Sequence, residues 1–183
     1  MNYLPTKLSG VFVVETSSRV DPRGSFERLY CAQQFSGLIG NKPIIQINRS
    51  RTTDIGAVRG MHFQYPPHAE IKVVRCMKGR IWDVAVDLRA GSSTFLQWHG
   101  EVLDPENSRG MVIPEGCAHG FQVLAQDSEL LYLHTASYAP ESEGGVSCRD
   151  PRLAIHWPLP ITELSAKDSN HTALSAEFSG IVV

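Results

Sequence analysis

Apolar and polar side chains alternate along much of the chain. Between residues 81 and 88, every even-numbered position carries a large apolar side chain, whereas the odd-numbered positions include Asp83 and Asp87. A period of two places the two kinds of side chain on opposite faces of a strand. The segment is therefore predicted to be a β-strand with two different faces.

Strand signals of this kind dominate the rest of the sequence, and turns rich in glycine and proline separate them. One short helix is predicted over residues 31–38, and the segment after Pro140 is predicted to be a loop-rich cap with a few helical turns. Many short strands joined by such turns indicate a sandwich or a small barrel. Further strands are predicted over residues 11–15, 44–49, 57–64, 71–78, 95–103, 110–113, 119–124 and 129–135.

Length and charge narrow the class of protein. The 183 residues suit one domain with a substantial core, so residues 1–183 are predicted to form a single domain. A formal net charge of -2 argues against a broad basic face for nucleic acid. No apolar run is long enough to cross a bilayer, and the N-terminus lacks the order of a secretory signal. Four scattered cysteines without a CxxC pair indicate reduced thiols. We expect a cytoplasmic protein without nucleic-acid or membrane partners.

Several side chains with useful chemistry fall on the predicted strands. The interior of a barrel is a natural pocket, because alternate residues of each strand point into it. His62 and Gln64 share one face of their strand, and Lys72, His119 and Tyr132 lie on three others. These groups could converge on one cavity.

The spacing of residues 56–79 resembles the first sequence motif of the cupins, and residues 114–119 resemble the second. Metal-binding cupins present two histidines as HxH in the first motif, and here Gln64 replaces the second one. Glutamine is a poor ligand for a transition metal, which prefers imidazole, carboxylate or thiolate. We therefore predict an all-β cupin-type jelly roll (a double-stranded β-helix) that needs no metal and no other cofactor.

A longer series of motifs covers nearly the whole chain. Each motif is weak by itself, but their joint occurrence in the correct order is strong. The motifs are Asp21-x-Arg23-Gly24-x-Phe26, Gln46-x-Asn48-x-Ser50, Val58-Arg59-Gly60-Met61-His62-Phe63-Gln64, Lys72-x-Val74-Arg75-Cys76, Asp83-Val84-Ala85-Val86-Asp87-Leu88-Arg89, Ile113-Pro114-x-Gly116-x-Ala118-His119-Gly120-Phe121, Tyr132, Tyr138-Ala139-Pro140-x-x-Glu143, Asp150-Pro151, Ile155-x-Trp157-Pro158 and Leu164-Ser165-x-Lys167-Asp168. By this series the chain resembles the dTDP-4-dehydrorhamnose 3,5-epimerase family.

The resemblance implies epimerisation, at C3 and C5 or at C3 alone, of a nucleotide-linked 4-keto-6-deoxyhexose. Such an enzyme needs a base, a cation or donor for the enolate oxygen, and an acid on the opposite face of the carbon. By resemblance, His62 is the base and Asp168 fixes its tautomer. Lys72 faces the enolate oxygen, and Tyr132 is the acid.

The resemblance also implies the residues that bind the substrate. Arg23 and Arg59 suit the diphosphate, because a forked cation matches paired oxygens. Arg28 stands where the family more usually carries glutamate, which reverses hydrogen-bond polarity and leaves the nucleotide open. The expected binding residues are Arg23, Phe26, Arg28, Gln46, Asn48, Arg59, His119, Tyr138 and Lys167.

The spacing of Arg59 and His62 leaves two alternatives open. Three residues apart in a regular strand, the two side chains would face opposite sides. Either Gly60 permits a bulge that turns both inward, or Arg59 reaches the diphosphate from the barrel mouth. The remaining histidines (His68, His99, His134, His156 and His171) are expected to be structural.

The resemblance further implies a homodimer, in which N-terminal strands join the partner's sheet and cover exposed edges. Three rival functions remain: a sugar-nucleotide 3,4-ketoisomerase, a cupin that only binds a sugar nucleotide, and a metal-dependent cupin oxygenase or isomerase. The cupin that only binds is disfavoured because the expected catalytic residues His62, Lys72, Tyr132 and Asp168 are all present. The metal enzyme is disfavoured because Gln64 replaces a ligand histidine.

Overall fold

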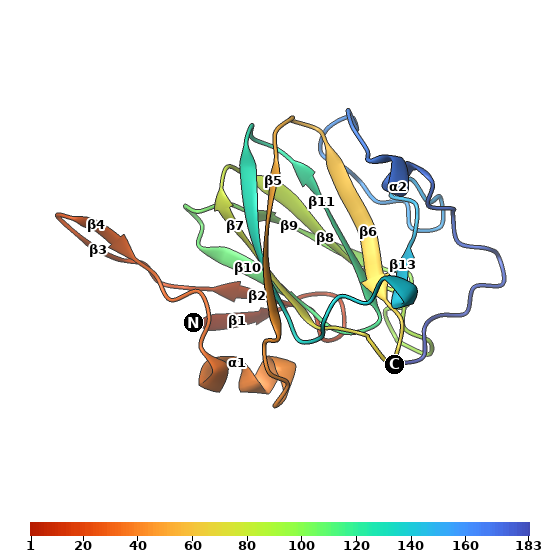
Figure 1. Cartoon of the computed structure of the whole chain (residues 1–183), viewed down its shortest axis with the longest axis horizontal. Coiled ribbons are helices and arrows are strands. Elements are labelled where there is room, and N and C mark those ends of the chain that lie inside the picture. Colours follow the sequence, from red (N-terminus) through yellow and green to blue (C-terminus); the bar gives the residue numbers. More distant parts are fainter.

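Two antiparallel sheets form a barrel in the computed structural model, which describes all of residues 1–183 (Figure 1). The larger sheet has the order β1 (Asn2–Pro5), β2 (Phe12–Glu15), β10 (Arg109–Ile113), β7 (Lys72–Lys78), β12 (Ser128–His134) and β5 (Gln46–Thr52). The smaller sheet has the order β13 (Glu143–Gly145), β6 (Val58–Gln64), β11 (Cys117–Val123), β8 (Ile81–Asp87) and β9 (Trp98–Leu103). Sequence neighbours are often not sheet neighbours, as expected for a jelly roll. The predicted all-β, cupin-type fold is confirmed.

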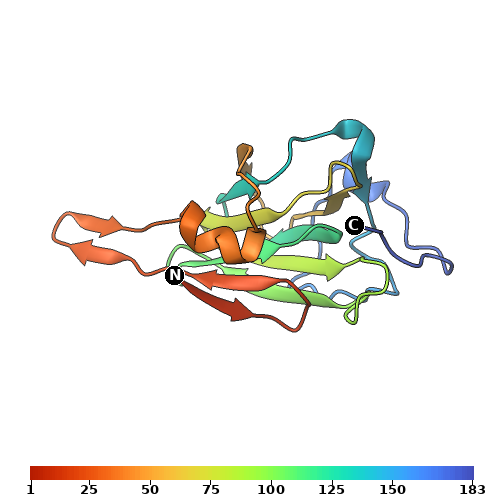
Figure 2. The same ribbon diagram turned by 90° about the horizontal axis from the view of Figure 1, so that it is seen from below.

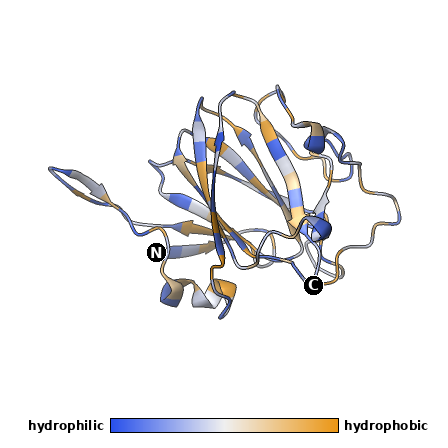
Figure 3. Ribbon diagram, viewed as in Figure 1, coloured by the Kyte–Doolittle hydropathy of each residue, from blue (hydrophilic) through white to orange (hydrophobic).

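Three apolar clusters hold the layers together. The first lies between the two sheets and includes Ile81, Phe121 and Leu130. The second joins the outer face of the smaller sheet to the C-terminal segment. The third packs helix α1 (Ala32–Ile39) on the outer face of the larger sheet. Figure 3 shows hydrophobic and hydrophilic residues alternating along several strands, which is the pattern that lets each strand serve two layers.

The predicted elements agree with the structure in the barrel and differ at its margins. Helix α1 is displaced by one residue from the prediction, and β9 is shorter because residues 95 and 96 form a turn and the strand begins at Trp98. The prediction omitted β1, β13 and a hairpin made of β3 (Arg19–Asp21) and β4 (Gly24–Phe26). These strands are only three or four residues long, too short for a clear alternation.

The β3–β4 hairpin projects away from the barrel in both ribbon views (Figures 1 and 2). Its side chains Val20 and Phe26 are 79% and 70% exposed, which is unusual for large apolar residues. The C-terminal segment carries the short helices η1 (Pro140–Ser142) and α2 (Ala166–Ser169), as the predicted cap with a few helical turns requires. No helix in the structure has the length and apolar character needed to span a membrane.

Candidate active site

A cavity of about 490 Å³ opens into the barrel. Its wall includes all four predicted catalytic residues and five of the nine predicted binding residues. The four are His62, Lys72, Tyr132 and Asp168, and the five are Asn48, Arg59, His119, Tyr138 and Lys167. The expected convergence of these side chains on one cavity is thus what the structure shows.

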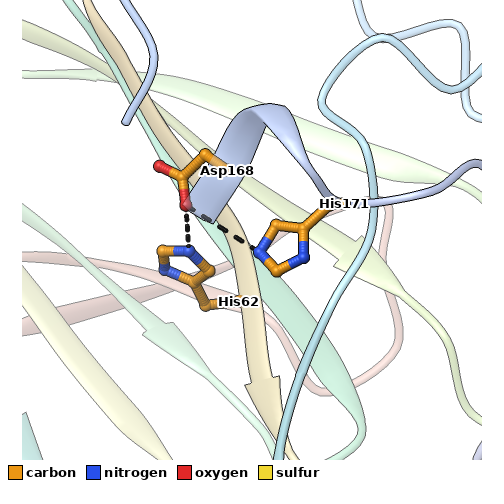
Figure 4. A group of neighbouring side chains, drawn as sticks. All are labelled: His62, Asp168 and His171. Atoms are coloured by element: carbon orange, nitrogen blue, oxygen red, sulfur yellow. Dashed lines mark hydrogen bonds and ion pairs between the residues drawn. The ribbon is translucent and has the colours of Figure 1, made fainter. Parts of the chain in front are cut away.

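His62 and Asp168 form a hydrogen-bonded pair at this cavity (Figure 4), with 2.6 Å between His62 Nε2 and Asp168 Oδ1. Asp168 is buried on α2, where its backbone N–H donates to the Ser165 hydroxyl that caps the helix. Burial alone would raise the pKa of Asp168, but the hydrogen bond and the charge of His62, with the N–H of Gly60, lower it. An ionised Asp168 accepts the proton on Nε2, which leaves Nδ1 as the free basic nitrogen of His62.

A bulge in β6 resolves the relation between Arg59 and His62. On β11, His119 pairs with His62 and Phe121 with Arg59, so the single residue Gly120 lies opposite two residues of β6. Gly60 has φ +131°, and a Cβ there would lie 2.5 Å from the Cα of Gly120. The bulge of the first alternative is therefore present, and Arg59 and His62 both line the cavity, although Arg59 stays exposed. The guanidinium of Arg59 has no hydrogen-bond or ion-pair partner in the chain, so it is free to bind an anion.

Lys72 lies beside the His62 pair on the opposite sheet. Its Nζ donates to the backbone oxygen of His62 at 3.3 Å and lies 3.2 Å from Glu70 Oε1. Glu70 also accepts from His134 Nδ1 at 2.7 Å. Burial alone would raise the pKa of Glu70, but the bond from His134 and the charge of Lys72 lower it. The carboxylate therefore anchors both neighbouring side chains on the cavity wall.

Tyr132 belongs to β12, in the sheet that faces His62 across the cavity. Its hydroxyl lies 3.3 Å from Ser50 Oγ, and its ring meets the ring of His119 edge to face at 5.9 Å. Burial raises the pKa of Tyr132, so the phenol stays protonated at neutral pH. His119 is itself fixed by a 2.6 Å hydrogen bond to the buried Asp83.

The rim of the cavity is held by Glu143. Its carboxylate accepts from the hydroxyl of Tyr138 at 2.6 Å and pairs with Lys167 at 2.5 Å. Burial alone would raise the pKa of Glu143, but these two hydrogen bonds lower it. Gln46 does not line the cavity; its side-chain oxygen accepts from the backbone N–H of Tyr138 at 3.1 Å. Gln46 therefore supports the rim residue Tyr138 without lining the cavity itself.

Besides Gln46, three predicted binding residues lie outside this cavity. Arg23 and Phe26 belong to the projecting β3–β4 hairpin, where they line a separate shallow hollow and Arg23 pairs with Asp21. Arg28 follows the hairpin and lines neither hollow. Within one chain, the structure does not bring these residues to the cavity.

The side chains at the usual cupin metal position do not fit a metal. Gln64 donates to two backbone oxygens and accepts from the N–H of Ala139 at 2.7 Å, so backbone groups hold its amide on both sides. Glu70 Oε2 is bonded to His134 and Glu70 Oε1 faces Lys72, while His119 Nε2 is bonded to Asp83. A separate group, His62, Asp168 and His171, does have the donor atoms for a metal within 4.8 Å of one another.

Sequence reasoning did not single out several residues of the wall. His134 and His171 were expected to be structural, whereas His134 lines the cavity and His171 packs against the ring of His62. Burial and the neighbouring His62 lower the pKa of His171. A signal for His134 existed in the sequence, because it lies two residues from Tyr132 and so shares its strand face.

Proton acceptors and donors on opposite sides of one cavity suit an enzyme that takes a proton from one face of a carbon and returns one to the other. The fold and the cavity define the class: a jelly-roll isomerase that works by acid–base chemistry.

Comparison with known proteins gives the family. Residues 5–176 match the family model of dTDP-4-dehydrorhamnose 3,5-epimerase. A protein of that name from Salmonella typhimurium is 43% identical over 171 residues, which cover 92% of this chain and 93% of that protein. A dTDP-4-dehydrorhamnose 3-epimerase from Streptomyces niveus is 36% identical, with 96% of this chain and 84% of that protein covered.

A solved structure points to the same family. The 3,5-epimerase of Legionella pneumophila, in complex with dTDP-4-keto-L-rhamnose, superposes with a TM-score of 0.91 at 37% identity, covering 100% of this chain and 98% of that chain. The present chain belongs to the dTDP-4-dehydrorhamnose 3,5-epimerase family, and it is an isomerase.

Proposed function

We propose that this enzyme epimerises a dTDP-linked 4-keto-6-deoxyhexose at C3, at C5 or at both. The observation that carries the proposal is that His62 with Asp168 lies on one side of the cavity, whereas Tyr132 and Lys72 lie on neighbouring strands of the sheet on the other side. One relative is named a 3,5-epimerase and another a 3-epimerase, and both names support the reaction class.

The reaction proceeds through an enolate. Nδ1 of His62 removes the proton from the carbon beside the ketone, and the electron pair moves onto the carbonyl oxygen. Asp168 stabilises the resulting imidazolium. The ammonium of Lys72 stabilises the oxyanion, a kind of contact whose loss costs roughly 3–4 kcal/mol in other enzymes. Tyr132 then donates its proton to the opposite face of the carbon, and the configuration is inverted.

The nucleotide binds at the rim. Arg59 supplies an unpartnered forked cation for the diphosphate, and Lys167, which is paired with Glu143, supplies an ammonium donor in the same wall. Asn48 presents an exposed amide, and Tyr138 offers a half-exposed ring on which a base can stack. These residues and the proposed catalytic residues line the same cavity of about 490 Å³, so the diphosphate and the sugar share it.

The enzyme acts as a homodimer in the cytoplasm, according to this proposal. The β3–β4 hairpin carries Arg23 and Phe26 far from its own cavity and exposes both. A second copy of the chain would cover the apolar surface of the hairpin, and the cavity of that copy would receive Arg23 and Phe26 from the first. All four cysteines are free thiols, in keeping with a reducing compartment. Light scattering should give the mass of two chains, and removal of residues 19–26 should give one.

Incubation with dTDP-, UDP-, GDP- and CDP-linked 4-keto-6-deoxy sugars in deuterated water tests the reaction. NMR should show deuterium at C3, C5 or both in an inverted dTDP sugar. A ketone that migrates to C3 would identify a 3,4-ketoisomerase instead. Nucleotide binding without exchange in any of the four sugars would contradict the proposal altogether.

A further inference from the structure

A third side chain reaches the His62–Asp168 pair from the C-terminal segment. His171 follows helix α2 and approaches the same carboxylate oxygen, with 3.8 Å from its Nε2 to Asp168 Oδ1 (Figure 4). Its ring meets the ring of His62 edge to face, with 5.5 Å between the centroids. Gly145 makes room for it, because a Cβ there would lie 2.2 Å from the His171 ring.

The His171 nitrogen has no partner of its own. Nε2 is buried and forms no hydrogen bond, although buried polar atoms are nearly always bonded. Asp168 is almost fully buried, while His62 keeps about a third of its side-chain surface exposed (32%) toward the cavity. The cluster thus has two imidazoles, one carboxylate and one open side.

We propose that His62, Asp168 and His171 bind a divalent transition-metal ion of the zinc type, and that the bound ion inhibits the enzyme. Two imidazoles and a carboxylate are ligands that zinc prefers, and three protein ligands with an open fourth position are a common zinc arrangement. The donor atoms already lie within 4.8 Å of one another.

Modest side-chain movement completes the geometry. Bonds of about 2.0–2.1 Å at tetrahedral angles place neighbouring ligand atoms roughly 3.3 Å apart. The two measured separations from Asp168, 2.6 and 3.8 Å, lie on either side of that value. The His62–Asp168 pair must open slightly, and His171 must move slightly closer.

Inhibition follows from the tautomer of His62. In the metal-free pair Nε2 carries the proton and Nδ1 carries the free lone pair. A metal ion needs the lone pair of Nε2, so the single proton of the neutral ring moves to Nδ1. The proposed base then has no lone pair with which to accept a proton. This consequence rests on the proposed function, whereas binding of the ion does not.

Calorimetric titration of the metal-free full-length protein with zinc chloride tests binding without any substrate. We expect one ion per chain, with affinity at least tenfold weaker in His171→Ala and His171→Gln, because loss of a ligand costs at least as much as loss of an outer-shell partner. His156→Ala, which removes an exposed histidine outside the cluster, is the matched control and should bind as the wild type does. Equal zinc affinity in the wild type and in both His171 variants would overturn the proposal.

Deuterium exchange into the substrate tests inhibition. Zinc should inhibit the wild type and His156→Ala reversibly, with recovery on addition of a chelator. Each His171 variant, compared with its own zinc-free rate, should resist zinc at concentrations that inhibit the wild type. Inhibition at the same zinc concentration in all four proteins would refute the link to His171. If the wild type shows no exchange at all, the proposed function fails, while the titration still decides the metal site.

Discussion

Replacement of Tyr132 by phenylalanine separates proton removal from proton return. The substitution keeps the aromatic ring and its contacts with His119 and His134, at 5.9 and 6.0 Å between ring centroids. It removes only the hydroxyl and its long 3.3 Å hydrogen bond to Ser50. Since an ordinary hydrogen bond contributes about 1 kcal/mol, unfolding free energy should fall by no more than that.

The effect on inversion should be much larger. Loss of a positioned acid lowers a rate by roughly 10²–10⁴-fold, or about 3–5 kcal/mol in barrier height. His62, Asp168 and Lys72 remain in place, so the enolate still forms and can recover a proton from the base side. Solvent deuterium should therefore enter substrate whose configuration is retained.

Proton NMR in deuterated water measures both outcomes in one sample. The expected result is slow inversion with continued deuterium exchange in the unepimerised sugar. Urea unfolding checks that the variant is folded. Inversion at close to the wild-type rate would show that Tyr132 is not the acid. Tyr138, or a water held by His119, would then have to donate the proton.

The remaining predictions concern the base, the metal and acid stability. His62→Ala should abolish deuterium uptake while dTDP binding, measured by calorimetry, stays nearly unchanged; exchange at the native rate would mean that another residue is the base. Asp168→Asn should lower the rate of exchange without abolishing it, because the imidazole remains while control of its tautomer is lost. Exhaustive chelation should leave full activity, and a loss that added zinc, iron or manganese restores would contradict metal-free catalysis. Burial alone would raise the pKa of Asp87, but hydrogen bonds from Arg89 and other neighbours lower it from 3.8 to about 2. The ionised Asp87 therefore contributes about 2 kcal/mol to the free energy of unfolding above pH 4, and this contribution is lost as the pH falls toward 2. In urea unfolding, Asp87→Asn should destabilise the protein at pH 7 and much less at pH 2. An equal effect at both pH values would refute the assignment.

Alternation along β8 illustrates how much of the fold follows from local pattern. The period of two identified the strand correctly, since side chains on opposite faces must meet different surroundings. The more apolar face, with Val84 and Val86, packs under the C-terminal segment rather than into the barrel. Asp83 points inward instead, where it holds His119. Which face turns inward depends on the covering layer, and no local pattern contains that information.

The Arg59–His62 spacing shows a similar limit at the site. The sequence contained the glycine that permits a bulge, but a regular strand and a bulged one were both compatible with it. The choice is made by β11, where Gly120 lets the two backbones approach closely. A bulge is a property of a strand pair, so it becomes visible only when both strands are in place.

The sequence by itself determined the longer strands, the fold class and the residue types of an acid–base site, because these depend on short-range alternation and on ordered motifs. Only the tertiary structure decided which groups touch. His62 and Asp168 are 106 positions apart, and Glu70 and His134 are 64 apart, yet both pairs are within hydrogen-bonding distance. The reason is physical: a hydrogen bond requires its two atoms within about 3 Å, and only the packing of the two sheets and the C-terminal cap sets distances on that scale.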